Sequence, residues 1–487
     1  MVNDVKMAGG GPERTGGGHS PCGSAAWRGV SVGQAVVLAL ALVVGLGAGT
    51  AGGRPATDGV ILAAQIAFLL LAVWRIATIL LSRPPRHATA SPSLMDPPAG
   101  GWPRYTLLIA LHDEAEVVGQ LAERLSMIDY PPDRLEALLL LEAHDAATIA
   151  AAMRAVRPHW MRVVIVPPGA PQTKPRALNF GLAQAKGELV TIYDAEDDPD
   201  PFQLREAAGR FAADIPGRLA CLQAPLRIRR KGRDGHAAPF LDRQFAVEYA
   251  GLFEVALPAL ARLGLPFPLG GTSNHFRADV LKAVGGWDAW NVTEDADLGF
   301  RLWRGGWRLG VLSRPTYETP PGALELWLPQ RTRWLKGYMQ TWGVHTRSLR
   351  GLGVRGAAAL ILTLGVGLTS AAIHAATLAW VLTAGLVAAT AGMSPDTPVF
   401  GLCVLVLGAA AAWLQGKIGA MRAHVPYSAT DMIAAPAYWS LLSLAFFHAV
   451  WRLVREPFAW DKTAHFRDDE PEREEALVEV DAGRQAA

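Results

Sequence analysis

The apolar segments near both ends of the chain constrain its fold more than any other feature. Residues 31–50 and 59–82 are each apolar over enough length to cross a bilayer core, which needs about 20 helical residues. The sequence therefore predicts two transmembrane helices within residues 31–82. Arg75 lies near the end of the second segment, where its long side chain is expected to reach the lipid headgroups.

A second apolar block follows the polar middle of the chain and occupies residues 356–451. Its first stretch, residues 356–392, is too long for one ordinary membrane helix, so a hairpin broken near His374 is expected. Together with the later apolar stretches, this predicts about four transmembrane helices in the block.

The charges beside the spans predict how the chain sits in the membrane. Arg28, Arg83 and Arg86 border the first two spans, which places the central domain in the cytoplasm by the positive-inside tendency. We therefore expect a multi-pass protein of the inner (plasma) membrane. An even number of later spans would return residues 452–487 to the cytoplasm, but the basic segment 417–424 would then face outward, which counts against this arrangement.

The tails and the composition exclude some classes of function. The Gly-rich residues 1–30 predict a disordered tail, and residues 452–487 predict a polar cytoplasmic tail. A formal net charge of +2 over 487 residues argues against nucleic acid as the main partner. Cys22, Cys221 and Cys403 lack metal or disulfide spacing, as expected of a cytoplasmic catalytic portion.

Residues 100–345 form the predicted working domain. Short apolar runs alternate there with helix-like segments, at residues 105–111, 136–142, 161–167 and 187–194. This alternation predicts an α/β fold with a doubly wound sheet and helices on its faces. Ligands of such sheets bind at the carboxyl ends of the strands, so the residues that follow each strand are the candidate site.

Acidic side chains end three of these strands. Glu114 follows the first strand, Glu142 ends the second, and Asp194 and Glu196 follow the fourth. Because the carboxyl ends of parallel strands share one edge of a sheet, we expect these carboxylates to converge.

The spacing of Asp194 and Glu196 favours a cation site over a solvated turn. Two carboxylates at the end of one strand can face the same ligand, and their hard oxygens suit Mg²⁺ or Mn²⁺, which keeps open positions for phosphate oxygens. The neighbouring Asp198 and Pro199 are expected to start the next helix, as its N-cap and first residue.

Lys174 and Arg176 lie upstream, at a predicted helix start. Cations and free backbone N–H groups at such a position favour a diphosphate. Basic residues on a helix are more often only solvated, so this signal gains weight only beside the acidic edge.

A later segment, "NVTEDADLGFRLW", opens another predicted helix at Thr293. Glu294 and Asp295 occupy its first turn, where the helix dipole favours negative charge, so capping explains them fully. The functional alternative is that Asp295 is a general base that takes a proton from an attacking hydroxyl.

The segment "WLPQRTRWLKGYMQTW" brings Gln330, Arg333 and Trp334 to one face of a predicted helix. An aromatic residue there is more often core packing or an interfacial anchor. An amide, a guanidinium and an indole on one face could also bind a diphosphate and stack on a sugar.

In this order, these motifs resemble the membrane-embedded family 2 glycosyltransferases, the family of cellulose and hyaluronan synthases. The resemblance covers roughly residues 100–345 and the flanking spans, and Thr-Glu-Asp at 293–295 with Gln-x-x-Arg-Trp at 330–334 is its most specific part. The segments "TKPRALNFGLAQAKGELVTIYDAEDDPDP" and "PLGGTSNHFRADVLKAVGGWD" are similar to those of exopolysaccharide synthases within the family.

The resemblance implies a GT-A fold and inverting transfer of a sugar from a nucleotide donor, usually UDP-linked, with Mg²⁺ or Mn²⁺. Asp194 and Glu196 would bind the metal and the diphosphate, although Glu196 stands where the family usually has Asp. Glu142 and Glu114 would contact the nucleotide, and both keep a carboxylate at a position where the family pattern differs.

The resemblance also assigns the residues of the reaction. Asp295 would be the catalytic base, and Glu294 would support the acceptor pocket. Gln330, Arg333 and Trp334 would hold the diphosphate and the acceptor sugar, as in processive members. The main hypothesis is therefore a β-linked polysaccharide, exported through the membrane helices with the help of partner proteins.

Two alternatives stay open at this point. One is a non-processive enzyme that adds a single sugar to a lipid, and product length separates it from the main hypothesis. The other is a membrane receptor or scaffold without catalysis, which the set of carboxylates argues against.

Overall fold

The computed structural model describes residues 24–26, 31–36, 39, 54–82, 96–98, 100–229, 238–391 and 399–459. The expected span over residues 31–50 and the two expected tails lie largely outside the described residues.

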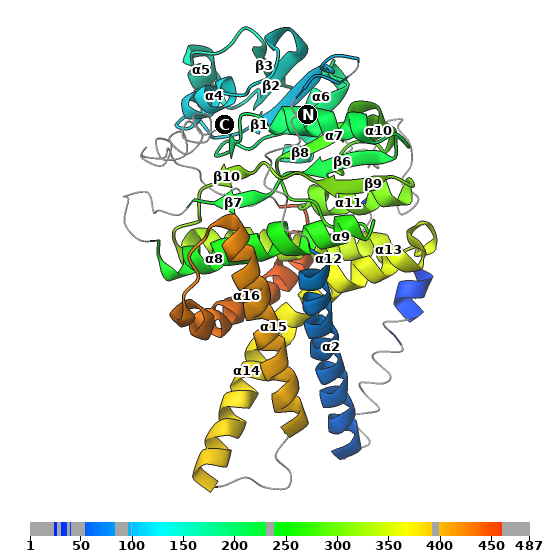
Figure 1. The fold of residues 1–487 in the computed structure, drawn as a ribbon, viewed down its shortest axis with the longest axis vertical. Coiled ribbons are helices and arrows are strands. Elements are labelled where there is room, and N and C mark those ends of the chain that lie inside the picture. Colours follow the sequence, from blue (N-terminus) through cyan, green and yellow to red (C-terminus); the bar gives the residue numbers. More distant parts are fainter. Residues whose placement is uncertain are drawn as a thin grey trace, which may run out of the picture.

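A seven-stranded sheet forms the centre of the working domain, in the order β3-β2-β1-β4-β8-β6-β9 (Figure 1). The strands are β1 Tyr105–Leu111, β2 Leu135–Glu142, β3 Met161–Val166, β4 Leu189–Ile192, β6 Leu219–Gln223, β8 Asn274–Arg277 and β9 Arg308–Val311. Strands β1 to β4 are parallel and match the four predicted runs.

The sheet is mixed, because β8 runs antiparallel to both of its neighbours, β4 and β6. Its first residue, Asn274, pairs with Gln223 at the carboxyl end of β6. The chain thus enters β8 from the carboxyl edge of the sheet and has to run back across it. The prediction of a doubly wound sheet is correct for the first four strands only.

Helices cover both faces of this sheet. The helices of the domain are α4 Val118–Ser126, α5 Ala146–Arg154, α6 Lys174–Gln184, α7 Gln203–Ala213, α8 Phe240–Gly251, α9 Leu257–Arg262, α10 Ala278–Ala283, α11 Glu294–Arg304 and α12 Leu324–Thr346. Of these, α8 and α12 pack mainly against the apolar helices described below. Leu107 and Ile109 of β1 pack into one hydrophobic core, and Leu108 packs into the core on the opposite face. Burial of both faces explains why the strand reads as a continuous apolar run.

A smaller sheet joins β5 Asp198–Pro199, β10 Thr316–Glu318 and β7 Leu226–Ile228. The prediction of a helix start at Asp198 and Pro199 was therefore wrong. Both residues pair with β10, and the following helix α7 begins only at Gln203.

The apolar helices are α2 Arg54–Leu81, α13 Gly353–Leu360, α14 Val366–Ala391, α15 Val399–Ala423 and α16 Ala429–Arg455. Within the described residues, three helical stretches are long and apolar enough to cross a membrane: Arg350–Ala391, Val399–Ala423 and Ala429–Arg455. The prediction of about four C-terminal spans was wrong because no hairpin forms at His374. Its ring instead hydrogen-bonds the Pro436 carbonyl of α16 at 3.2 Å, inside an unbroken α14.

Only some of these helices extend away from the domain. Figure 1 shows α2, α14 and α15 pointing away from the sheets, whereas α16 stays beside α8 and α12. Arg243 and Gln244 of α8 hydrogen-bond Asp431 in the first turn of α16. At the other end of α16, the Glu456 carbonyl accepts a hydrogen bond from Lys336 of α12 at 3.2 Å. With both ends held by the domain, α16 runs along it.

The basic segment 417–424 also lies at the domain. Arg422 donates to the Glu254 carbonyl at 2.7 Å and to Ser82 Oγ at 3.0 Å, just beyond the end of α2. In the sequence analysis, an outward-facing segment 417–424 counted against the predicted membrane arrangement. The structure removes this objection, because α14 leaves the domain and α15 returns to it.

Candidate active site

A cavity of about 750 Å³ lies between the carboxyl edge of the large sheet, α11, α12 and the apolar helices. All predicted site residues except Arg176 line it: Glu114, Glu142, Lys174, Asp194, Glu196, Glu294, Asp295, Gln330, Arg333 and Trp334. Side chains that are up to 220 residues apart in the chain therefore share one space.

Lys174 connects the strand edge with the neighbouring loop. Its Nζ forms an ion pair with Asp194 and donates to the Gly271 carbonyl at 2.8 Å. Burial lowers the pKa of Lys174, but the carboxylates of Asp194 and Glu294 outweigh burial and hold that pKa above its usual value. A fixed ammonium charge thus lies inside the cavity, at the position predicted for a diphosphate.

Arg176 binds a protein carboxylate in this structure. Its Nη2 contacts both carboxylate oxygens of Glu142, at 2.8 and 2.6 Å, and its Nη1 donates to the Pro167 carbonyl at 2.8 Å. Arg176 therefore orients Glu142 at the cavity wall and does not reach the cavity itself.

Glu114 is buried beside the end of β1. Its backbone N–H donates to Thr148 Oγ1 at 2.9 Å, and the preceding Asp113 donates its N–H to Asp145 at 2.6 Å. Asp113 has a φ of 53°, so the chain turns sharply here and directs Glu114 inward.

Two further acids near the site were missed in the sequence. Asp197, fully buried, accepts hydrogen bonds from Thr272 and from the Asp194 N–H. Glu318, at the end of β10, lines the cavity. Burial raises the pKa of both groups well above normal, and the charges of Asp194 and Glu196 raise them further. Asp197 lies in the acidic run of the sequence, whereas no local pattern marks Glu318.

This acidic edge suits a divalent cation by the chemistry of its donors. Burial is the main cause of the raised pKa values of Asp197 and Glu318, and repulsion among the carboxylates adds to it; a hard cation relieves such repulsion. Among the described residues, no three His, Cys, Asp or Glu side chains are arranged to hold a metal alone. Asp194 and Glu196 could supply two ligands, and Mg²⁺ usually takes one or two carboxylates plus phosphate oxygens and water.

The first turn of α11 places the candidate base in the cavity. Asp295 Oδ1 accepts the Ala296 N–H at 2.7 Å. Burial raises the pKa of Asp295 to about 6, and it raises the pKa of Glu294 to about 8 together with the Asp295 charge. The two titrations are coupled, so near neutral pH the pair shares about one proton.

Gly337 allows α12 to touch the start of α11. A Cβ atom at this position would lie 2.3 Å from Thr293 Oγ1 and 2.5 Å from its Cγ2. Only glycine fits there, so the residue just before Glu294 and Asp295 rests directly on the backbone of α12.

Gln330, Arg333 and Trp334 line the cavity from α12, as predicted for one helical face. The neighbouring Arg331 points elsewhere and binds Glu248 of α8 through two hydrogen bonds of 2.8 and 2.7 Å. Its guanidinium lies 4.5 Å from the Trp334 ring centre, so the buried Arg331 makes a cation–π contact with the indole.

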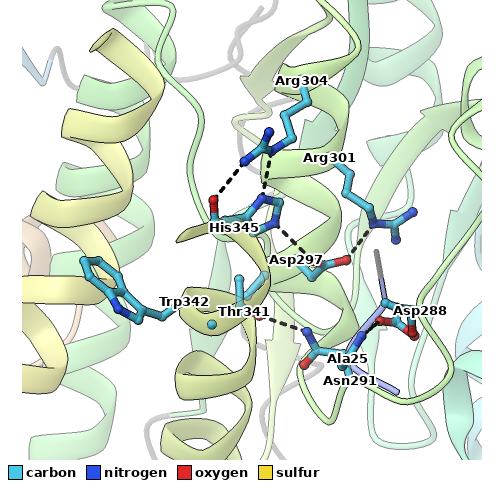
Figure 2. Close-up of polar contacts among 12 residues, drawn as sticks. Ala25, Asp288, Asn291, Asp297, Arg301, Arg304, Thr341, Trp342 and His345 are labelled. Atoms are coloured by element: carbon cyan, nitrogen blue, oxygen red, sulfur yellow. Dashed lines mark hydrogen bonds and ion pairs between the residues drawn. The ribbon is translucent and has the colours of Figure 1, made fainter. Parts of the chain in front are cut away.

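A second buried network joins α11 to α12 (Figure 2). Asp297 accepts Arg301 Nε–H at 2.6 Å and contacts His345 Nε2 at 3.0 Å. Because Arg304 Nε–H donates to His345 Nδ1 at 3.1 Å, we assign the ring proton to Nε2. Burial opposes ionisation of Asp297, but Arg301 and His345 lower its pKa to about 2. Two residues from Asp295, this network fixes α11 on α12.

Another part of the cavity is apolar and is formed mainly by the apolar helices. It is lined by Leu71 and Trp74 of α2, Leu252, Phe253 and Leu257 beside α9, Leu364 and Gly367 near the start of α14, Ala412 of α15, and Trp439 of α16. The same space therefore connects carboxylates with surfaces suited to acyl chains.

Comparison with known proteins agrees with the fold. Residues 103–337 match the model of glycosyltransferase-like family 2. Beta-monoglucosyldiacylglycerol synthase of Synechocystis is 28% identical over 286 residues, covering 55% of this chain and 57% of that protein. Cellulose synthase 1 catalytic subunit of Komagataeibacter xylinus is 26% identical over 252 residues, covering 50% of this chain and 32% of that protein.

A solved structure shares the fold. The mannosyltransferase PcManGT from Pyrobaculum calidifontis, in complex with GDP-Man and Mn²⁺, superposes with a TM-score of 0.50 at 18% identity. The match covers 80% of this chain and 98% of that one. By sequence, the chain spans little more than half the length of the glucosyldiacylglycerol synthase that it matches.

Proposed function

We propose that this chain, whose residues 103–337 are a family 2 glycosyltransferase domain, moves a sugar from a UDP-linked donor to a hydroxyl group of a membrane lipid. The observation that supports this best is the single cavity that runs from Asp194 and Asp295 to the apolar helices. A donor can bind at its polar end while a lipid enters at the other.

Asp295 is the proposed general base. It takes the proton of the acceptor hydroxyl as the acceptor oxygen forms a bond to the anomeric carbon and the bond to the donor phosphate breaks. A base whose pKa is about 6 is largely ionised at neutral pH yet still basic enough to accept the proton. Attack opposite the leaving group inverts the anomeric configuration.

Lys174 and Arg333 stabilise the negative charge that develops on the departing nucleoside diphosphate. Asp194 and Glu196 would hold a divalent cation, which supplies further positive charge at the phosphates when it is bound. Gln330 adds a recognition group, because its Oε1 is buried at the cavity and accepts no hydrogen bond within the described part of the chain. An acceptor hydroxyl suits this oxygen.

A lipid acceptor is supported better than the polysaccharide of the main sequence hypothesis. The relatives at 28% and 26% identity include monoglucosyldiacylglycerol synthases, whereas the cellulose synthase match covers only a third of that protein. The motif of Gln330, Arg333 and Trp334 still favours a polysaccharide, and the size of the product distinguishes the two. In either case we place the domain at the cytoplasmic face of the inner membrane.

The test uses the purified full-length protein in mixed micelles that contain dioleoylglycerol. UDP-glucose, UDP-galactose and UDP-N-acetylglucosamine are supplied in turn, and the radiolabelled product is separated by thin-layer and size-exclusion chromatography. A labelled lipid of one added sugar supports the proposal, and a labelled polymer of high mass contradicts it. Asp295→Asn should lower transfer at least a hundredfold without weakening donor binding.

A further inference from the structure

Arg75 of α2 lines the cavity. Within the described residues, its guanidinium donates no hydrogen bond and forms no ion pair. The same cavity is lined by the apolar Leu71 and Trp74 of α2 and by the polar Gln244 and Glu248 of α8. A guanidinium has five N–H donors, and leaving them without partners in such a place is costly.

The charges around Arg75 leave one positive charge unbalanced. Glu248 is the carboxylate whose charge acts on Arg75. Arg331 already binds both oxygens of Glu248, at 2.8 and 2.7 Å. His374 also interacts with Arg75, but its ring hydrogen-bonds the Pro436 carbonyl and brings no negative charge. Two guanidinium groups thus share one carboxylate, and a ligand with one negative charge would restore balance.

The depth of Arg75 matches that of a lipid headgroup. It lies six residues before Leu81, the last residue of α2, which at about 1.5 Å per residue places it about 9 Å from that helix end. That end is held at the domain, because the Leu81 carbonyl accepts a hydrogen bond from Arg262 and Ser82 Oγ accepts one from Arg422. With α2 crossing the membrane, an anion at this level would be a lipid headgroup.

We propose that Arg75 binds the phosphate of a membrane lipid whose headgroup enters the cavity from the side of α2. Arg is suited to this ligand because its planar fork of donors matches two phosphate oxygens. The lipid is either a phosphate-bearing acceptor or a phospholipid that lies beside a neutral acceptor. The inference rests on the proposed function for the first of these sources only.

The first experiment measures lipid binding without any sugar donor. Purified full-length protein in detergent is titrated with dioleoyl phosphatidylglycerol or with dioleoylglycerol, and binding is followed by the rise in melting temperature. Arg75→Gln should weaken binding of the phosphate lipid about ten- to a hundredfold and leave dioleoylglycerol unaffected. Arg75→Lys keeps the charge without the fork and should weaken phosphate binding less. Arg455→Gln, at an exposed arginine of α16, is the matched control and should bind like wild type.

The second experiment separates the two sources of phosphate. Sugar transfer is measured to a polyprenyl phosphate and, separately, to dioleoylglycerol with and without phosphatidylglycerol. If Arg75 binds the phosphate of the acceptor, Arg75→Gln should raise the KM for polyprenyl phosphate about tenfold or more. A bystander phospholipid predicts that phosphatidylglycerol stimulates transfer to dioleoylglycerol in wild type but not in Arg75→Gln.

Equal affinity of wild type and Arg75→Gln for phosphatidylglycerol would overturn the proposal, whatever the transferase assay shows. The proposal would also be overturned if, without lipid, both Arg75→Gln and Arg75→Lys melted at a lower temperature than the wild type. Such a result would assign Arg75 a role in folding. If no acceptor is glycosylated by any variant, the proposed function fails, while the donor-free titration still tests Arg75.

Discussion

Replacement of Gly337 by alanine tests whether contact between α12 and the start of α11 positions the candidate base. The added methyl carbon would lie 2.3 Å from Thr293 Oγ1, 2.5 Å from Cγ2 and 2.7 Å from Cβ. Ordinary contacts begin at about 3.4 Å, so the two helices must separate by about 1 Å. Thr293 directly precedes Glu294, so this shift reaches Asp295.

The magnitude follows from this displacement. A misplacement of about 1 Å at reacting groups can cost about a hundredfold in rate, which corresponds to about 2.7 kcal/mol of transition-state stabilisation. Overpacking of the buried contact should also lower the free energy of unfolding by about 1–3 kcal/mol. We therefore expect a loss in kcat that is larger than the change in the KM for the nucleotide sugar.

The assay compares kcat, KM and thermal unfolding of Gly337→Ala with those of Gly343→Ala. Gly343 lies on the same helix, and a Cβ there meets no atom within 4 Å, so its replacement should be neutral or stabilising by about 1 kcal/mol. Adding Thr293→Ala to Gly337→Ala should restore part of the activity, because it removes two of the three colliding atoms. If Gly337→Ala matches Gly343→Ala in both rate and stability, the reasoning is refuted.

Three further predictions follow from the site. The rate of transfer by the wild type should fall as the pH drops through about 6, because burial raises the pKa of Asp295 to about 6 and only its carboxylate accepts a proton. A profile of kcat/KM that stays flat from pH 7 to pH 5 would contradict this. Asp297→Asn should lower the free energy of unfolding by about 3–5 kcal/mol, because it leaves Arg301 buried without its anion. Denaturant titrations should show this loss shrinking as the pH falls from about 4 towards 2, because the wild type then loses the stability that the depressed pKa of Asp297 provides. EDTA should abolish transfer, and Mn²⁺ or Mg²⁺ should restore it, whereas full activity in EDTA would exclude a required cation at Asp194 and Glu196.

The strand edge was predictable because its signals are local. Each of the first four strands is a short apolar run, and residues that follow parallel strands must meet at one edge. Glu142 and Asp194 therefore line the same cavity, as expected. Glu318 was not predictable, since it reaches the cavity only through the pairing of β10 with β5 and β7, strands of two and three residues.

Other features depend on contacts between distant helices, which the sequence does not display. The two hydrogen bonds between Arg331 and Glu248 join α12 to α8, and no spacing within either helix marks them. The expected hairpin at His374 failed for a related reason: residues 366–391 contain no proline, and α16 supplies the hydrogen-bond partner that the histidine needs.

Length and apolar composition also fail to distinguish a helix that crosses a bilayer from one that lies along its surface. The 27 residues of α16 would suit either, yet Asp431 and Glu456, near its two ends, are both tied to the domain. A helix held along the domain in this way would lie at the membrane surface, between the protein and the acyl chains. Lateral pressure and spontaneous curvature of the bilayer would then change how tightly the domain binds the membrane surface. Lipid composition could therefore alter the rate of sugar transfer without any molecule binding in the catalytic cavity.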